Sequence, residues 1–217
     1  MQEEQPVKRS WFTGVVVVLL VASMTYNMFL FSQKLHSDQR ERVEAGERII
    51  HAAWDTKLYA ETILSQTQTL MASSSLEERI MAKQELSYAF GNSAQGLQDL
   101  IVAAQEQEPR DLPSQLRDAF TFMKEVEASL RIIGNHEGQL TGPERAYLAQ
   151  VESWYTRLLE EITAFDVTRA TQQESLLMFT DTEWVDIAYA MVSIMNEPDT
   201  SLYEGVEESE LETNTDS

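Results

Sequence analysis

The distribution of hydrophobic residues divides the chain into one uniformly apolar stretch and a series of amphipathic segments. Trp11–Phe31 reads WFTGVVVVLLVASMTYNMFLF and holds no charged residue over 21 positions. A helix of that length spans about 30 Å, the thickness of the hydrocarbon core of a bilayer. A cleaved signal peptide would have a shorter apolar region followed by a small-residue cleavage site, and this stretch contains no clean site of that kind. The sequence therefore predicts an uncleaved transmembrane anchor over residues 11–31.

The charges that flank the anchor do not fix its orientation, because two basic residues precede it and three follow it closely. The lengths of the segments before and after the anchor are more informative about its orientation. A short lead before a long apolar stretch is typical of a signal-anchor, and long domains that follow such an anchor translocate largely regardless of their charge. We therefore expect residues 1–10 to form a short cytoplasmic tail and the bulk of the chain to lie outside the cytoplasmic membrane.

The pattern after the anchor predicts that the first helix continues to about residue 72, with residues 32–48 as a polar stalk. Three sets of positions at heptad-like spacing widen its apolar side beyond the seam of a two-stranded coiled coil. This helix should therefore be flanked by two neighbours. The three sets are Val43, Ile50, Leu64 and Met71; Gly46, Ala53, Ala60 and Thr67; and Ile49, Ala52, Tyr59, Ile63 and Leu70.

Four more amphipathic helices are predicted, over about residues 75–107, 113–133, 142–165 and 181–195. Short connections between amphipathic helices favour antiparallel neighbours around one core. The sequence thus predicts an all-α fold, in which a single N-terminal transmembrane helix is followed by an antiparallel bundle of four to five helices over residues 49–197.

Local signals mark where these helices begin and bend. A serine or threonine followed three residues later by glutamate forms a capping box. Three such pairs occur, Ser75–Glu78, Thr141–Glu144 and Thr180–Glu183. Pro113 suits the first turn of the third predicted helix, and the spacing places Phe120 on the apolar face of that helix. Gly91 and Gly96 fall inside the second, where glycine is costly, and they indicate a kink or a close crossing.

Composition limits the range of functions. The net charge of −20 lies entirely after the anchor, so nucleic acid and anionic lipid headgroups would be repelled. The absence of cysteine excludes disulfides and thiolate metal sites. Residues 198–217 hold seven acidic residues and no basic one, which predicts a disordered acidic tail.

No motif for catalysis, for a cofactor or for a metal stands out, so we expect no enzyme. His51 and Asp55 have the i, i+4 spacing of a metal-binding pair, but two ligands do not make a site and a surface pair is the simpler interpretation. The large aromatic residues are core residues by default. The alternative is that some of them face outward and bind a partner. The candidates for that role are Trp54, Tyr88, Trp154 and Trp184.

Two short motifs resemble a known family. Leu140–Glu144 followed by Tyr147, and later Glu183–Ile187, are similar to helix starts in the helical N-terminal region of the YpeB family of spore-germination membrane proteins. The single anchor and the order of helices are similar too, over about residues 12–195. The resemblance implies a spore inner-membrane protein that partners a cortex-lytic hydrolase. That family continues into PepSY domains, whereas residues 198–217 of this chain are predicted to form an acidic tail.

Two functional hypotheses of different kinds follow. In the first, the chain is a non-enzymatic, membrane-anchored bundle that binds and positions another envelope protein, in sporulation or germination if the resemblance holds. In the second, it is an extracytoplasmic ligand-sensing four-helix domain of the chemoreceptor type, although residues 1–10 are short for a cytoplasmic output. The sequence leaves open whether the chain forms a homo-oligomer.

Overall fold

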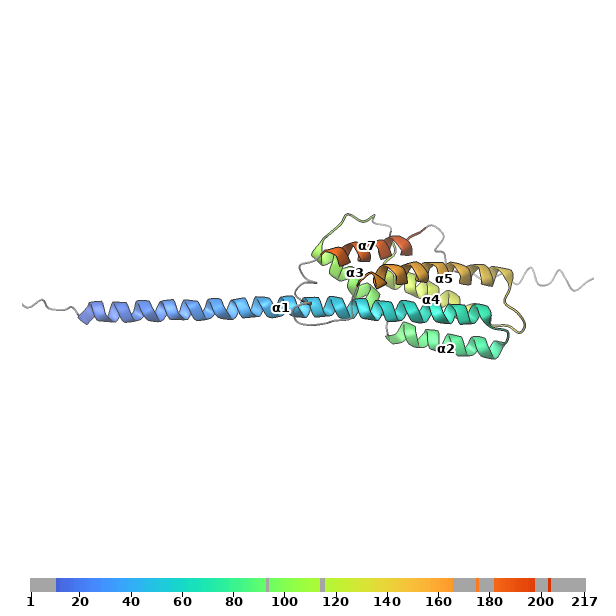
Figure 1. Cartoon of the computed structure of the whole chain (residues 1–217), viewed down its shortest axis with the longest axis horizontal. Helices are drawn as coiled ribbons and strands as arrows, with labels where there is room; N and C mark the ends of the chain where they lie inside the picture. The colour runs from blue at the N-terminus through green and yellow to red at the C-terminus, as the bar shows by residue number, and fades with distance from the viewer. Residues whose placement is uncertain are drawn as a thin grey trace, which may run out of the picture.

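A computed structural model of the chain describes residues 11–92, 94–113, 116–165, 175, 182–197 and 203. In these residues every regular element is an α-helix, which confirms the predicted fold class. The helices are α1 (Trp11–Ala72), α2 (Leu76–Asn92), α3 (Gln95–Gln107), α4 (Ala119–Ile132), α5 (Gly142–Thr163) and α7 (Glu183–Met195), as Figure 1 shows.

The apolar stretch and the first bundle helix form one continuous helix of 62 residues. At 1.5 Å per residue α1 is about 93 Å long. Its residues 11–42 are all exposed, and the first buried side chain is Val43. The bundle therefore begins six residues before the predicted boundary at 49, and the exposed stalk is shorter than predicted. Within the described residues, α1 is the one helix long and apolar enough to cross a membrane.

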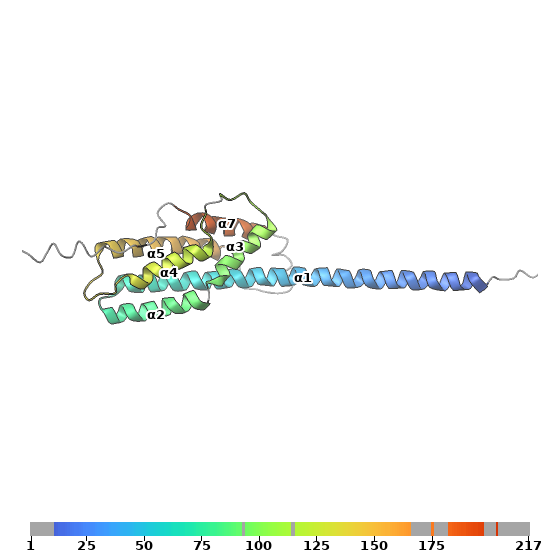
Figure 2. The same ribbon diagram turned by 180° about the vertical axis from the view of Figure 1, so that it is seen from behind.

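The other helices pack around the C-terminal half of α1, which contacts α2, α3 and α5 (Figures 1 and 2). The chain reverses direction after α1, runs back through α2 and α3, and reverses again for α4, for α5 and for α7. We call the end of the bundle nearest the apolar stretch the anchor end and the opposite end the far end. The predicted antiparallel arrangement is present.

The apolar positions predicted on α1 form its buried face. The small residues Ala53, Ala60 and Thr67 are at most 2% exposed, and Tyr59, Ile63 and Leu70 at most 1%. These small residues let the neighbouring helices pack closely against α1. As a result, α1 lies at the centre of the bundle rather than at its edge.

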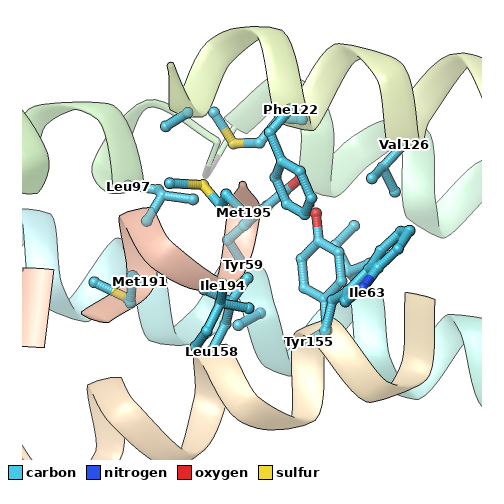
Figure 3. Close-up of a cluster of buried hydrophobic side chains, with 14 of the residues drawn as sticks. Tyr59, Ile63, Leu97, Phe122, Val126, Tyr155, Leu158, Met191, Ile194 and Met195 are labelled. Atoms are coloured by element: carbon cyan, nitrogen blue, oxygen red, sulfur yellow. The ribbon is translucent and has the colours of Figure 1, made fainter. Parts of the chain in front are cut away.

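The core joins all the bundle helices around an aromatic cluster (Figure 3). The hydroxyls of Tyr59 on α1 and Tyr155 on α5 are hydrogen-bonded at 2.9 Å, and the ring of Phe122 on α4 stacks on Tyr155. Burial raises the pKa of both tyrosines, so both stay protonated at neutral pH. Leu158, Met191 and Met195 fill the space toward the anchor end.

The second predicted helix is in fact two. α2 ends at Asn92 and α3 starts at Gln95, because α3 has to leave the axis of α2 to cross α1. The crossing is at Gly96, where a Cβ atom would lie 2.8 Å from the carbonyl oxygen of Ala52 and 2.9 Å from the amide nitrogen of Thr56. The predicted close crossing is confirmed at Gly96. Gly91 is exposed, with nothing near its Cβ direction.

The capping predictions have mixed outcomes. The box at Thr141 and Glu144 is complete, with Pro143 in the first turn. At α2 the amide of Glu78 donates to Ser75 Oγ at 3.3 Å, but the Glu78 carboxylate accepts from the Ser74 amide instead. For α7 the N-cap is Thr182, which makes no side-chain cap hydrogen bond, and Thr180 lies outside the described residues.

Two more predictions on the third helix are wrong. Helix α4 begins at Ala119 rather than at Pro113, because the side chain of Asp118 accepts a hydrogen bond from the amide of Thr121 and caps the helix there. Phe120, which the spacing suggests for the apolar face, is 51% exposed.

Most of the predicted acidic tail, and with it the prediction of disorder, lies outside the described residues. Tyr203 is described and contacts the bundle. Its amide donates to Ser129 Oγ at 3.0 Å, and its ring centroid lies 5.5 Å from that of Tyr147.

Candidate partner-binding surface

The four candidate aromatic residues divide into two pairs. Trp154 and Trp184 are 4% and 2% exposed and belong to the core, so the suggestion that they face a partner is wrong for these two. Trp154 packs edge-on against both Phe122 and Tyr147. Trp54 and Tyr88 are 49% and 72% exposed, on α1 and α2 respectively, and remain available for binding.

Tyr88 stands on an apolar outer face of α2. Ile80 and Met81 are more than half exposed on the same helix. Met81 and Tyr88 are seven residues apart, which is two turns, so they lie on the same side. Exposed aromatic and methionine side chains are well suited to protein contacts, because both bury a large apolar area and the flexible methionine adapts to the shape of its partner.

The largest hollow we describe lies between α1 and α3, at the anchor end of the bundle. Its volume is about 670 Å³. Figures 1 and 2 show why it forms, since α3 runs obliquely away from α1 beyond their crossing. We call it the α1–α3 groove. It is lined by Ala45, Arg48, Ile49, His51, Ala52, Asp55, Asp99, Val102, Ala103, Glu106 and Gln107.

The possible metal-binding pair His51 and Asp55 lies in this groove. Both line it, together with Asp99 and Glu106 from α3. No group of three or more histidine and acidic side chains among the described residues is arranged to hold a metal ion. The interpretation of His51 and Asp55 as surface residues therefore remains the simpler one.

A second polar cluster lies at the far end, where the loop between α4 and α5 meets α2. Arg79 on α2 is fully buried, and its Nη2 donates to the carbonyls of His136 at 2.7 Å and Gly138 at 2.9 Å. Lys83 donates to the carbonyl of Arg131 at 3.0 Å, and burial lowers the pKa of Lys83 to about 8. These bonds fasten the loop to α2.

Glu144 organises the same loop from the α5 side. Its carboxylate accepts hydrogen bonds from the amide of Gly134 at 2.6 Å, from His136 Nε2 at 2.9 Å and from the amide of Thr141 at 2.8 Å. Gly134 has a φ of +67°, a conformation in which glycine is unstrained, and this turns its amide toward the carboxylate. Burial opposes ionisation of Glu144, but these bonds outweigh it and lower its pKa to about 2.

We expect Glu144→Gln to lower the free energy of unfolding by about 2 kcal/mol at pH 7, because charge-assisted hydrogen bonds are replaced by weaker ones. The folded pKa lies below the ordinary value of 4.5, so ionised Glu144 stabilises the fold above that pH and loses this effect as the pH falls toward 2. Urea unfolding of both proteins at pH 7, 4 and 3 should therefore show a shrinking difference. A difference that stays constant with pH would contradict this assignment.

Comparisons of the chain with protein-family models, with curated proteins and with solved structures found no match. The described surfaces must therefore be interpreted from their own chemistry.

Sequence reasoning missed the two charged residues that are buried in the described part of the chain. Arg79 falls at an apolar-face position of α2, and a single arginine there gives no signal beyond its spacing. Glu144 was expected as a cap only. Its additional contacts depend on a ten-residue return of the chain from Gly134, which no local pattern indicates.

Proposed function

We propose that this chain is a non-enzymatic, single-pass membrane-anchored helical bundle that binds another envelope protein and positions it near the membrane. One observation carries the proposal. The apolar stretch and the central helix of the bundle are a single uninterrupted α1.

The exposure of α1 supports the membrane anchor. Every residue from 11 to 42 is exposed, so no described part of the chain covers the apolar side chains of Trp11–Phe31. An apolar surface of this size is unfavourable in water and favourable in lipid. Residues 32–42 then hold the bundle about 17 Å beyond the apolar stretch. A bundle carried in this way has a fixed distance from the bilayer, which suits a positioning role.

We further propose that the bundle lies outside the cytoplasmic membrane, with residues 1–10 inside. A reporter enzyme that is active only in the cytoplasm, fused after Ser217, is expected to be inactive in intact cells. The same reporter fused before residue 11 should be active. The reverse pattern would contradict the orientation but not the anchor.

The chemistry of the surface limits the kind of partner. The net charge of −20 disfavours nucleic acid, whereas the exposed Trp54 and Tyr88 suit a protein. If the resemblance to the YpeB helical region reflects common ancestry, the protein sits in the spore inner membrane and its partner is a cortex-lytic hydrolase. The partner itself has to be identified by experiment.

Crosslinking in intact membranes followed by purification of the tagged chain tests the proposal. We expect one specific envelope protein to be retained, and Trp54→Ala with Tyr88→Ala to reduce its retention, because truncating an aromatic anchor costs about 2 kcal/mol or roughly 30-fold in affinity. Phe120→Ala is the matched control, since Phe120 is an aromatic residue on α4 that is about as exposed as Trp54.

All three residues are exposed, so these changes should shift stability by less than about 1 kcal/mol. Retention that survives the double change would remove Trp54 and Tyr88 from the interface. Turnover of a substrate by the purified bundle would contradict the non-enzymatic reading.

A further inference from the structure

The α1–α3 groove has the shape of a helix-binding site. On α1 its lining runs along one face from Ala45 to Asp55, which is about 15 Å or three turns. On α3 it runs from Asp99 to Glu106, which is two turns. The two helical walls diverge from their close contact at Gly96 and leave a slot for about ten residues of a third helix.

The floor of the groove is apolar, and three of the residues that line the groove are alanines. Ile49 and Ala52 are 5% and 6% exposed, and Ala103 is partly buried. Val102 is 39% exposed and stands in the opening. Alanine on both walls lets the backbone of an incoming helix approach closely, and the aliphatic atoms give its apolar face a surface to cover.

The rim of the groove is acidic. Asp55, Asp99 and Glu106 contribute three carboxylates from the two walls, against the guanidinium of Arg48 and the imidazole of His51. Asp99 accepts a hydrogen bond from Gln95 at 2.8 Å. In the part of the chain that the structure describes, Asp55 and Glu106 make no ion pair. A segment with lysine or arginine on both sides of an apolar stripe would satisfy them.

Charge and geometry disfavour a second copy of this chain as the occupant. A parallel copy anchored in the same membrane would bring its own Glu47 and Asp55 to the level of the acidic rim, and two chains of net charge −20 repel each other. An antiparallel copy would place its own apolar stretch away from the membrane.

We propose that the α1–α3 groove receives a basic amphipathic helix of the partner protein, which enters along the exposed stalk from the anchor end. This inference rests on the proposed function and names the chemistry of the partner's contact. A partner helix that lies beside α1 at the membrane surface reaches the groove by following residues 32–42, which carry no other described segment. Its apolar stripe covers Ile49, Ala52 and Val102, and its basic residues pair with the rim.

The absence of cysteine makes a direct test simple. The full chain in nanodiscs of zwitterionic phosphatidylcholine is given a unique cysteine by Val102→Cys. The probe is a synthetic 14-residue amphipathic helix with alanine and leucine on one face, lysine on both flanks and one cysteine in the apolar face. We expect saturable binding and disulfide crosslinking at position 102. Ile132→Cys on α4 is the control, because Ile132 is a similarly exposed aliphatic residue outside the groove.

A matched pair of charge variants tests the rim. Asp55→Asn with Glu106→Gln is expected to weaken probe binding about tenfold, the effect of losing two exposed ion pairs. Glu85→Gln with Glu160→Gln removes the same charge from exposed positions on α2 and α5 and should leave the affinity within about twofold. A probe with glutamate in place of every lysine should not bind.

Equal crosslinking at positions 102 and 132, equal weakening by the two charge pairs, or no saturable binding of the lysine probe would each overturn the proposal. These results do not depend on the native partner. Undiminished retention of that partner in membranes by the Asp55→Asn and Glu106→Gln chain would also overturn the groove assignment while leaving the proposed function intact.

Discussion

Removing residues 1–31 is expected to move the protein completely from the membrane to the soluble fraction without unfolding the bundle. In the proposed function the apolar stretch supplies the affinity for lipid, and no described residue before Val43 is buried. The shortened chain should give a strongly helical circular dichroism spectrum and a single cooperative unfolding transition, unchanged by a chelator. Fractionation and thermal unfolding measure the two parts of this result. A shortened chain that stays with the membrane would show that the bundle itself binds lipid.

Loss of the anchor should also release the partner from the membrane, because the high local concentration that the tether provides is lost. Deletion of residues 198–217 is the matched truncation. It removes seven acidic residues, whose influence is screened over about 8 Å at physiological salt, and Tyr203, whose described contacts are with Ser129 and Tyr147 of the bundle itself, so partner retention should be nearly unchanged. Release of the partner by the tail deletion alone would place the main contact in the tail.

Replacing Gly96 with leucine is expected to lower the free energy of unfolding by more than about 3 kcal/mol, at or above the upper end of the usual cost of overpacking. A Cβ atom at this position would lie within 3 Å of backbone atoms of both Ala52 and Thr56, and backbone cannot move aside as a flexible side chain can. The two helices would have to separate, and the α1–α3 groove would change shape with them. Urea unfolding of the soluble bundle measures the loss.

Gly91→Leu is the control for Gly96→Leu. Gly91 is exposed near the end of α2 and nothing lies within 4 Å of its Cβ direction. Leucine there should stabilise the helix by up to about 1 kcal/mol, since glycine is the poorer helix former. A similar loss from both replacements would mean that Gly96 matters only through local helix propensity and not through the crossing.

The sequence predicted best what depends on periodicity. The stripes on α1 were recognisable because its buried positions cover more than half of the helix circumference and recur over four heptads. The close approach at Gly96 was also predictable, since glycine inside a helix requires a reason. The break between α2 and α3 was not, because it is caused by the direction in which α3 must cross α1, and direction is a property of the packed bundle.

Local capping signals were less reliable than the stripes. Thr141 and Glu144 formed their box, whereas Asp118 rather than Pro113 determined where α4 begins. Several residues near a helix start can usually cap it, and the tertiary contacts determine which of them does. The aromatic candidates show a similar limit, because Trp54 and Trp154 look alike in sequence and only the placement of neighbouring helices exposes one and buries the other.

Because α1 is unbroken, the number of residues in the stalk also determines how the bundle is rotated about the axis of α1 relative to the anchor. Each residue added to the exposed stalk would raise the bundle by about 1.5 Å and turn it by about 100° relative to the anchor. Two added residues would rotate the α1–α3 groove to roughly the opposite side of the anchor. Seven added residues would raise the groove by about 10 Å and return it almost to its original orientation. The length of the stalk in this protein thus determines the direction in which the groove faces neighbouring membrane proteins.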